Sequence, residues 1–228
     1  IGCQQPDDVT SLLVIGLGAG TVPKQFTAVY GEDVAIDGVE IDSKVIEIGR
    51  EYFDMAEPNL TTYAEDGRTY LQRVDHKYNI IAVDAYRQPY IPFHLATQEF
   101  FIAARDRLRD DGVLALNAGR TATDFRLVDV LSETMRSVFP YVYVIDLPTG
   151  FNNSLIYGTL QPAQTSDIRA RALASHNPSL TEIANREWSL REILDARTIY
   201  TDDRAPVERL IDDIIVREAL GGESGRRR

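Results

Sequence analysis

Runs of consecutive apolar residues alternate with helical patterns through the first half of the chain. Continuous apolar runs such as IIAV are typical of strands buried on both faces of a sheet. Strands that alternate with helices predict an α/β fold with a parallel sheet and helices on both faces. The expected strands are residues 12–15, 34–40, 79–84 and 113–117, with a short one near 61–63, and the expected helices are 23–30, 43–53, 68–74 and 97–108.

The pattern changes after residue 117. A helical segment, 124–138, precedes two apolar runs, 141–146 and 154–159, which are joined through Pro148, Gly150 and Asn152-Asn153. These turn formers predict a hairpin-like antiparallel pair at one edge of the sheet. We expect one domain over residues 1–220, followed by a disordered tail over 221–228. Its last part is helical and polar, with helices over 165–175, 179–187 and 204–220.

The segment from Leu12 to Asp42 carries the most informative chemistry. Its first apolar run breaks into a turn with Gly16, Gly18 and Gly20, and the strand after the next helix ends in Glu40. Glycines let the backbone approach a ligand closely, and an acid roughly 20 residues further on can hold two ribose hydroxyls. The segment therefore predicts a nucleotide or nucleoside cradle.

Polar residues follow the other predicted strands at their carboxyl ends, where ligands bind in open α/β sheets. They are Asp66-Gly67, Asp84-Ala85-Tyr86 and Asn117. The sequence lacks the GxxxxGK[ST] phosphate loop, and a crevice rich in carboxylates is a poor site for pyrophosphate. A neutral or cationic nucleoside, such as an adenosyl sulfonium, suits it better.

Each of these groups also has a structural interpretation that the sequence leaves open. The glycine turn could be only a tight strand-to-helix connection, and Glu40 could be a solvated strand end. Asp66 could cap the following helix, since Asp is a favoured N-cap. Asp84 could be structural, although an acid at the end of an apolar strand is costly without a partner. Tyr86 and Tyr90 could be packing groups or walls of a binding site.

Composition narrows the class of protein. The 228 residues, 44% of them hydrophobic, suit one large α/β domain. A formal net charge of −11 argues against a nucleic-acid surface. The single cysteine, Cys3, favours a reducing, cytoplasmic location. No apolar stretch approaches the ~18 residues of a membrane span, and because the chain begins at Ile1 we expect it to be a piece of a longer protein.

The sequence shows little evidence of a metal-binding site or of a catalytic nucleophile. No spacing of His, Cys and Asp suggests a metal site, and the Ser and Cys residues lack the neighbours of a catalytic triad. We expect His94 to be a structural hydrogen-bonding residue, and His76 and His176 to lie at the surface.

Five segments, taken in order, resemble the aminopropyltransferase family, which comprises spermidine synthase and its relatives. They are VIGLGAG, VEIDSKVIEIGREYF, AEDGRTYL, YNIIAVDAY and FHLATQEFF. The resemblance runs from about Leu12 to Asn117, and more loosely to Glu208. IPFHLATQEFF and TDDRAPVERL are similar to spermidine synthase-like domains that are fused to membrane segments, so the protein is expected to be cytoplasmic or the cytoplasmic domain of a membrane protein.

The resemblance implies a methyltransferase-like (Rossmann-like), doubly wound and mostly parallel seven-stranded sheet with an antiparallel edge hairpin. It implies no tightly bound cofactor, decarboxylated S-adenosylmethionine or S-adenosylmethionine as co-substrate, and a small amine such as putrescine as acceptor. Homodimers are common among the relatives. By position, Glu40 would hold the ribose hydroxyls, Asp66 with Gly67 would meet the adenine, and Asp84 would orient and deprotonate the amine. The implied nucleoside-binding residues are Gly16, Gly18, Gly20, Glu40, Ile41, Asp66 and Gly67, and the implied catalytic residues are Asp84 and Tyr86.

Three features depart from the family pattern. Ala19 stands where the glycine loop usually carries an Asp that grips the amino group of the aminopropyl arm. Arg87 replaces the second acid of a DSSD-like segment, and a cation there would repel a diamine if it pointed inward. The residues before Leu12 are too few for the family's small N-terminal β-domain. The leading hypothesis is an aminopropyltransferase, and the alternatives are an S-adenosylmethionine-dependent small-molecule methyltransferase and a nucleoside-binding sensor without turnover.

Overall fold

The computed structural model describes residues 9–86, 90–147, 152–175, 177–186 and 189–220. Some of the predictions above concern residues outside these ranges. They are the ones that involve Cys3, Arg87, Pro148, Gly150, His176 and the tail 221–228.

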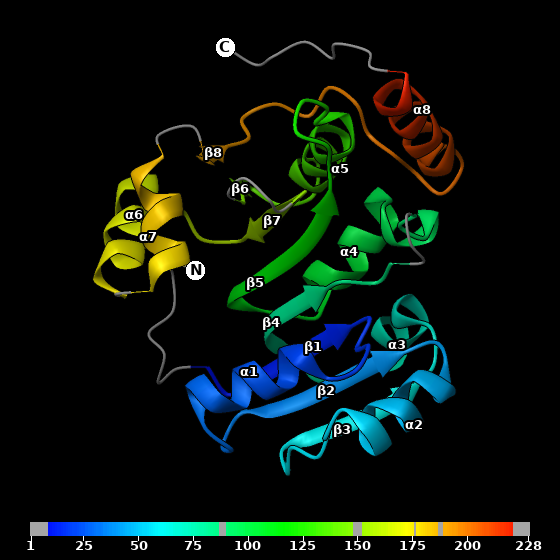
Figure 1. The fold of residues 1–228 in the computed structure, drawn as a ribbon, viewed down its shortest axis with the longest axis vertical. Helices are drawn as coiled ribbons and strands as arrows, with labels where there is room; N and C mark the ends of the chain where they lie inside the picture. The colour runs from blue at the N-terminus through cyan, green and yellow to red at the C-terminus, as the bar shows by residue number, and fades with distance from the viewer. Residues whose placement is uncertain (1–8, 87–89, 148–151, 176, 187–188, 221–228) are drawn as a thin grey trace.

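A single sheet of eight strands, in the order β3-β2-β1-β4-β5-β7-β6-β8, organises the described part of the chain (Figure 1). The pairs from β3 to β5 are parallel, and β5–β7, β7–β6 and β6–β8 are antiparallel. The predicted doubly wound fold with an antiparallel hairpin is therefore confirmed. The strands are β1 Ser11–Ile15, β2 Ala35–Glu40, β3 Leu60–Ala64, β4 Tyr78–Val83, β5 Leu108–Gly119, β6 Tyr141–Asp146, β7 Asn153–Thr159 and β8 Leu190–Glu192.

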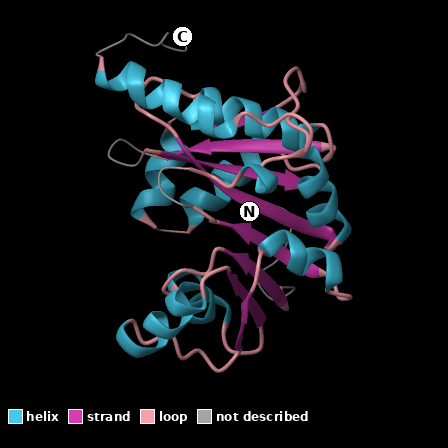
Figure 2. Cartoon of the chain, turned by 90° about the vertical axis from the view of Figure 1, so that its right-hand side faces the viewer, coloured by secondary structure: helices cyan, strands magenta, loops and turns pink. Residues whose placement is uncertain are grey.

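Helices cover both faces of this sheet (Figure 2). Alternate residues of the strands pack on the two faces of the sheet, because successive side chains point to opposite faces. Leu13 and Ile81 join the larger core with α3, α4, α5 and α8, whereas Leu12 and Val14 pack with residues of α1 on the other face. The helices are α1 Thr21–Tyr30, α2 Ser43–Tyr52, α3 Gly67–Arg73, α4 Gln98–Asp106, α5 Arg126–Arg136, α6 Thr165–Ala174, α7 Pro178–Asn185 and α8 Val207–Ala219, with a 3₁₀ turn, η2, at Phe93–Leu95.

Two strands differ from the prediction. β8 makes the sheet eight-stranded rather than seven-stranded, and it escapes the pattern because only Leu190 of its three residues is apolar. It adds to the outer edge of β6, where Arg191 pairs with Asp146. β5 begins at Leu108 rather than 113, because the exposed residues 109–111 continue the strand past an irregularity in its pairing with β4.

After β8 the C-terminal segment leads to the face of the sheet that α3, α4 and α5 cover. α8 packs its buried residues Val207, Ile211 and Ile214 into the larger core, near α5 (Figure 1). Among the described residues, none of the helices combines the length and the apolar character that crossing a membrane requires.

Candidate active site

The glycine turn after β1 touches the end of β4. Gly16 has φ +84°, and a Cβ there would lie 2.6 Å from the carbonyl oxygen of Asp84. The same junction is closed by the Asp84 amide, which donates to the Ile15 carbonyl at 2.8 Å. Only glycine combines this conformation with so close an approach. The turn therefore lies directly against the residue expected to handle the amine.

Glu40 lies beside the same turn. One carboxylate oxygen accepts a hydrogen bond from the Gly18 amide at 3.1 Å, and the other accepts from the Asp42 amide at 3.3 Å. Each oxygen keeps a further lone pair, so the carboxylate is oriented and can still accept from a ligand hydroxyl. Ile41, the next residue, is 71% exposed, which leaves its side chain accessible to a ligand at this edge.

Asp66 combines the two roles that the sequence left open. One carboxylate oxygen accepts from the Thr69 amide at 2.9 Å and caps α3, and the other lies 2.7 Å from Nε2 of His94. The predictions of a cap and of a hydrogen-bonding His94 are confirmed. Burial acts to raise the pKa of Asp66, but these hydrogen bonds outweigh it and lower the pKa below the ordinary value. The carboxylate is therefore ionised and fixed at neutral pH.

Gly67 permits the close contact between α3 and β1. A Cβ at Gly67 would lie 2.2 Å from a methyl carbon of Ile15. The absent side chain lets the N-terminus of α3 settle on β1, and this contact places Asp66 at the carboxyl edge of the sheet. Glycine is therefore needed at 67 for packing, whatever its backbone binds.

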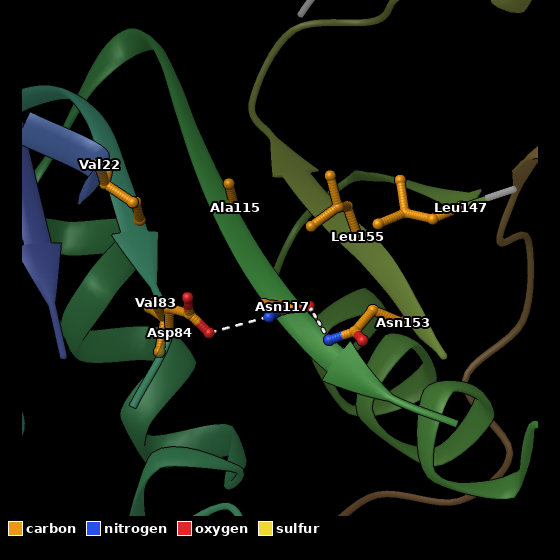
Figure 3. Close-up of a pocket in the computed structure, with 9 residues that line it drawn as sticks. Val22, Val83, Asp84, Ala115, Asn117, Leu147, Asn153 and Leu155 are labelled. Atoms are coloured by element: carbon orange, nitrogen blue, oxygen red, sulfur yellow. Dashed lines mark hydrogen bonds between the residues drawn. The ribbon is translucent and has the colours of Figure 1, made fainter. Parts of the chain in front are cut away.

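Asp84 begins a chain of hydrogen bonds that crosses three strands (Figure 3). The side-chain Nδ2 of Asn117, near the end of β5, donates to the Asp84 carboxylate at 2.9 Å, and Nδ2 of Asn153 at the start of β7 donates to the side-chain Oδ1 of Asn117 at 2.8 Å. Burial by surrounding atoms raises the pKa of the Asp84 carboxyl above its ordinary value, and the Asn117 hydrogen bond opposes this only in part. The geometry orients a carboxylate of raised basicity towards the cleft.

The Tyr86 hydroxyl braces the end of β5. It donates to the Asn117 carbonyl at 2.8 Å and accepts from the Gly119 amide at 2.7 Å. Burial raises the pKa of this hydroxyl, so it remains protonated at neutral pH. A catalytic role for Tyr86 stays a prediction, and its contacts are those of a group that holds Asn117 in place.

A cleft of about 380 Å³ opens beside Asp84. Its polar side chains, those of Asp84, Asn117 and Asn153, gather at one end, and apolar side chains form the rest of the wall (Figure 3). The sequence pattern indicates only a turn former at Asn153. The signal that could have identified it is its place at the start of β7, which runs antiparallel to β5 and so begins beside the carboxyl end of that strand. The apolar wall consists of Val22, Ala82, Val83, Ala115, Leu147 and Leu155.

The structure thus brings the predicted residues to one edge of the sheet. The glycine turn contacts both Glu40 and Asp84, while Asp66 lies at the end of β3 with His94 as its partner. Within the described ranges, no group of three or more His, Cys, Asp or Glu side chains could hold a metal ion.

Comparison of the sequence with protein-family models identifies the family of this chain. The model for the spermine/spermidine synthase domain matches residues 3–169, which is more than half of the chain. The chain belongs to the spermine/spermidine synthase family. The matched region contains the turn, Glu40, Asp66, Asp84 and Asn117, and it ends before β8 and α8.

Similar proteins extend this family assignment. A Bifidobacterium longum protein named as a probable polyamine aminopropyl transferase is 34% identical over 93% of this chain, which spans 52% of that protein. An N-terminal histidine N-methyltransferase from Emericella nidulans is 34% identical over 69% of this chain and 29% of its own length. The crystal structure of a probable spermidine synthase from Corynebacterium glutamicum matches with a TM-score of 0.69 and 20% identity, covering 99% of this chain and 74% of the other. The chain therefore spans about half the length of the Bifidobacterium longum relative, and it has the spermidine synthase fold.

Proposed function

We propose that this domain binds decarboxylated S-adenosylmethionine and transfers its aminopropyl group to a small amine such as putrescine. The observation that carries the proposal is the Asp84 carboxylate at the edge of the cleft. Asn117 orients this carboxylate, and desolvation by the surrounding atoms raises its pKa. Membership of the spermine/spermidine synthase family supports it. The glycine turn, Glu40 and Asp66 with Gly67 supply the groups that a nucleoside needs at the same edge.

The chemistry is a direct displacement. The amine nitrogen attacks the methylene carbon next to the sulfonium, the carbon–sulfur bond breaks with its electrons going to sulfur, and methylthioadenosine leaves. The attacking nitrogen must be neutral before attack and must shed a proton after it. In this proposal Asp84 accepts that proton, and its raised pKa, which brings its basicity closer to what a general base needs, supports the assignment. Fixed carboxylates around the sulfonium stabilise the cationic substrate.

Calorimetric titration with methylthioadenosine, decarboxylated S-adenosylmethionine and intact S-adenosylmethionine tests the nucleoside half of the proposal. We expect tighter binding of the decarboxylated form, together with release of methylthioadenosine when putrescine is added. Preference for the intact form would replace the proposal by methyl transfer. Binding of a nucleoside without turnover of any amine in a panel would indicate a sensor domain. Failure of all three ligands to bind would contradict a nucleoside site.

Methyl transfer is the second candidate, and Ala19 favours it. Ala19 removes the acid that in the family grips the aminopropyl ammonium, and such an acid would also repel the methionine carboxylate of intact S-adenosylmethionine. A relative named as a histidine N-methyltransferase also matches this chain.

The substitution Ala19→Asp measures how strongly residue 19 determines the preference between decarboxylated and intact S-adenosylmethionine. We expect the variant to shift the ratio of the two dissociation constants towards the decarboxylated form by about tenfold, the effect of one charged contact of about 1.4 kcal/mol. The ratio is measured by calorimetry, with methylthioadenosine, which lacks both groups, as the control ligand. An unchanged ratio would show that position 19 does not contact the arm of the co-substrate.

A further inference from the structure

A turn in the C-terminal segment contacts the N-terminal ends of α3 and α4. Thr201 and Arg204 pair across a tight turn, and the buried Tyr200 fixes its start through the Tyr200 carbonyl, which accepts from the Gln98 amide at 2.8 Å. Asp202 lies at the tip of this turn. The turn is outside residues 3–169, the region that the family model matches.

Asp202 is held by four contacts. Its carboxylate receives two hydrogen bonds from the Arg68 guanidinium, at 2.8 and 2.6 Å, and one from the hydroxyl of the fully buried Thr97 at 2.8 Å. Its amide donates to Glu99 at 3.0 Å. The bidentate geometry fixes the guanidinium plane as well as its position. The turn is therefore joined to the first turns of both α3 and α4.

We call the hydrogen bonds of Asp202 with Arg68, Thr97 and Glu99 the clasp. Arg68 connects this clasp to the proposed adenine site. The guanidinium nitrogen that donates to Asp202 also donates to the His94 carbonyl at 3.3 Å. The His94 ring in turn lies 2.7 Å from the second oxygen of Asp66. Arg68 follows Asp66 by two residues in α3, so one side chain fixes both the helix that Asp66 caps and the residue that orients its carboxylate.

We propose that Asp202 is a positioning residue for nucleoside-base recognition, acting through Arg68 and His94 on the Asp66 carboxylate. The inference rests on the proposed function, because it takes Asp66 as the group that meets the base. It assigns to the C-terminal turn a part in completing a site whose other residues come from the matched domain. Without the clasp, His94 and the start of α3 have more freedom, and the carboxylate is less well oriented for an exocyclic amino group.

The test uses the full chain and two neutral probes, methylthioadenosine and methylthioinosine, in which a carbonyl replaces the amino group of the base. The wild-type protein is expected to prefer methylthioadenosine, since a carboxylate accepts from an amino group and repels a carbonyl oxygen. Asp202→Asn keeps the size of the side chain but weakens its bond to Arg68. We expect it to reduce the preference between the two probes by about threefold to tenfold.

Two further variants separate positioning from folding. Arg68→Lys keeps the charge but loses the bidentate bond, so it should reduce the same preference. Asp195→Asn makes the same substitution in an exposed pair with Arg197, and it should leave the preference unchanged. A merely structural role would weaken both probes equally and would lower the thermal midpoint. Unchanged base preference in Asp202→Asn would overturn this inference alone, whereas absence of methylthioadenosine binding by the wild-type protein would overturn the proposed function and this inference with it.

Discussion

Asp84 is exposed at the end of an apolar strand, yet nearby atoms raise the pKa of its carboxyl. A raised pKa in the folded protein means that folding disfavours the ionised form, so ionisation at neutral pH lowers the free energy of unfolding. An acid that lowers stability is expected where function requires it. The direction of this shift agrees with a catalytic role for Asp84, and that role stays a prediction.

Asp84→Asn should therefore lose activity without losing stability. We expect turnover to fall by at least about 10²-fold, the contribution of a general base, with methylthioadenosine affinity retained. The thermal midpoint at pH 7 should equal or exceed that of the wild-type protein. Wild-type activity should decrease as the pH falls through the raised pKa, because protonation removes the base. Asp33→Asn, at the amino end of β2, is the matched control; a variant at 84 that unfolds earlier would point to a structural acid.

Single residues could be predicted where one side chain has one strong local signal. Glu40 ends β2, at the spacing from the glycine turn that predicts a ribose-binding acid, and Asp66 caps α3, so both could be located from spacing. Asn153 and Asp202 could not, since each acts on a residue far away in the chain, Asn117 and Arg68 respectively. Contacts of this kind depend on strand order and on the path of the C-terminal segment, which no local pattern encodes.

At the scale of elements, α3 and β1 approach each other so closely at Gly67 that an added Cβ there would come nearer to a neighbour than at any other described glycine. Gly67→Ala would place a methyl group 2.2 Å from Ile15. We expect the free energy of unfolding to fall by about 1–3 kcal/mol, the cost of overpacking, measured by urea denaturation. Gly119→Ala is the control, because its Cβ would meet only the Tyr86 hydroxyl, at 3.9 Å, and it should be neutral or slightly stabilising. Equal effects of the two substitutions would contradict a special role for the α3–β1 contact.

Elements with continuous apolar runs or clear caps were the predictable ones. β6 has the predicted bounds, and the hairpin with β7 forms as the turn residues indicated. β8 and the first part of β5 were missed because both are rich in charged residues, and the edge of the sheet and the pairing with β4 hold them extended. Tertiary pairing, rather than local preference, determines such strands.

For the whole molecule, the sequence was sufficient for the fold class, since strand order in a doubly wound sheet brings the carboxyl ends to one edge. The location of the site at that edge stays a prediction. Homodimer formation, an accompanying membrane segment and a cytoplasmic location stay predictions. The acceptor depends on the cleft and on the loops around it, and Arg87 lies outside the described residues. One global property still bears on the acceptor, namely the charge of the chain.

A net charge of −11 creates a negative field that favours cationic ligands at long range. Salt screens this field, since the Debye length falls from about 14 Å to about 4 Å between roughly 0.05 M and 0.5 M ionic strength. We expect KM for putrescine, a dication, to rise by about threefold to tenfold over this range. The dissociation constant of neutral methylthioadenosine should change little and serves as the control. An amine KM that is independent of salt would show that the acceptor site is insulated from the surface charge, and an equal change for both ligands would indicate a general effect of salt on the fold.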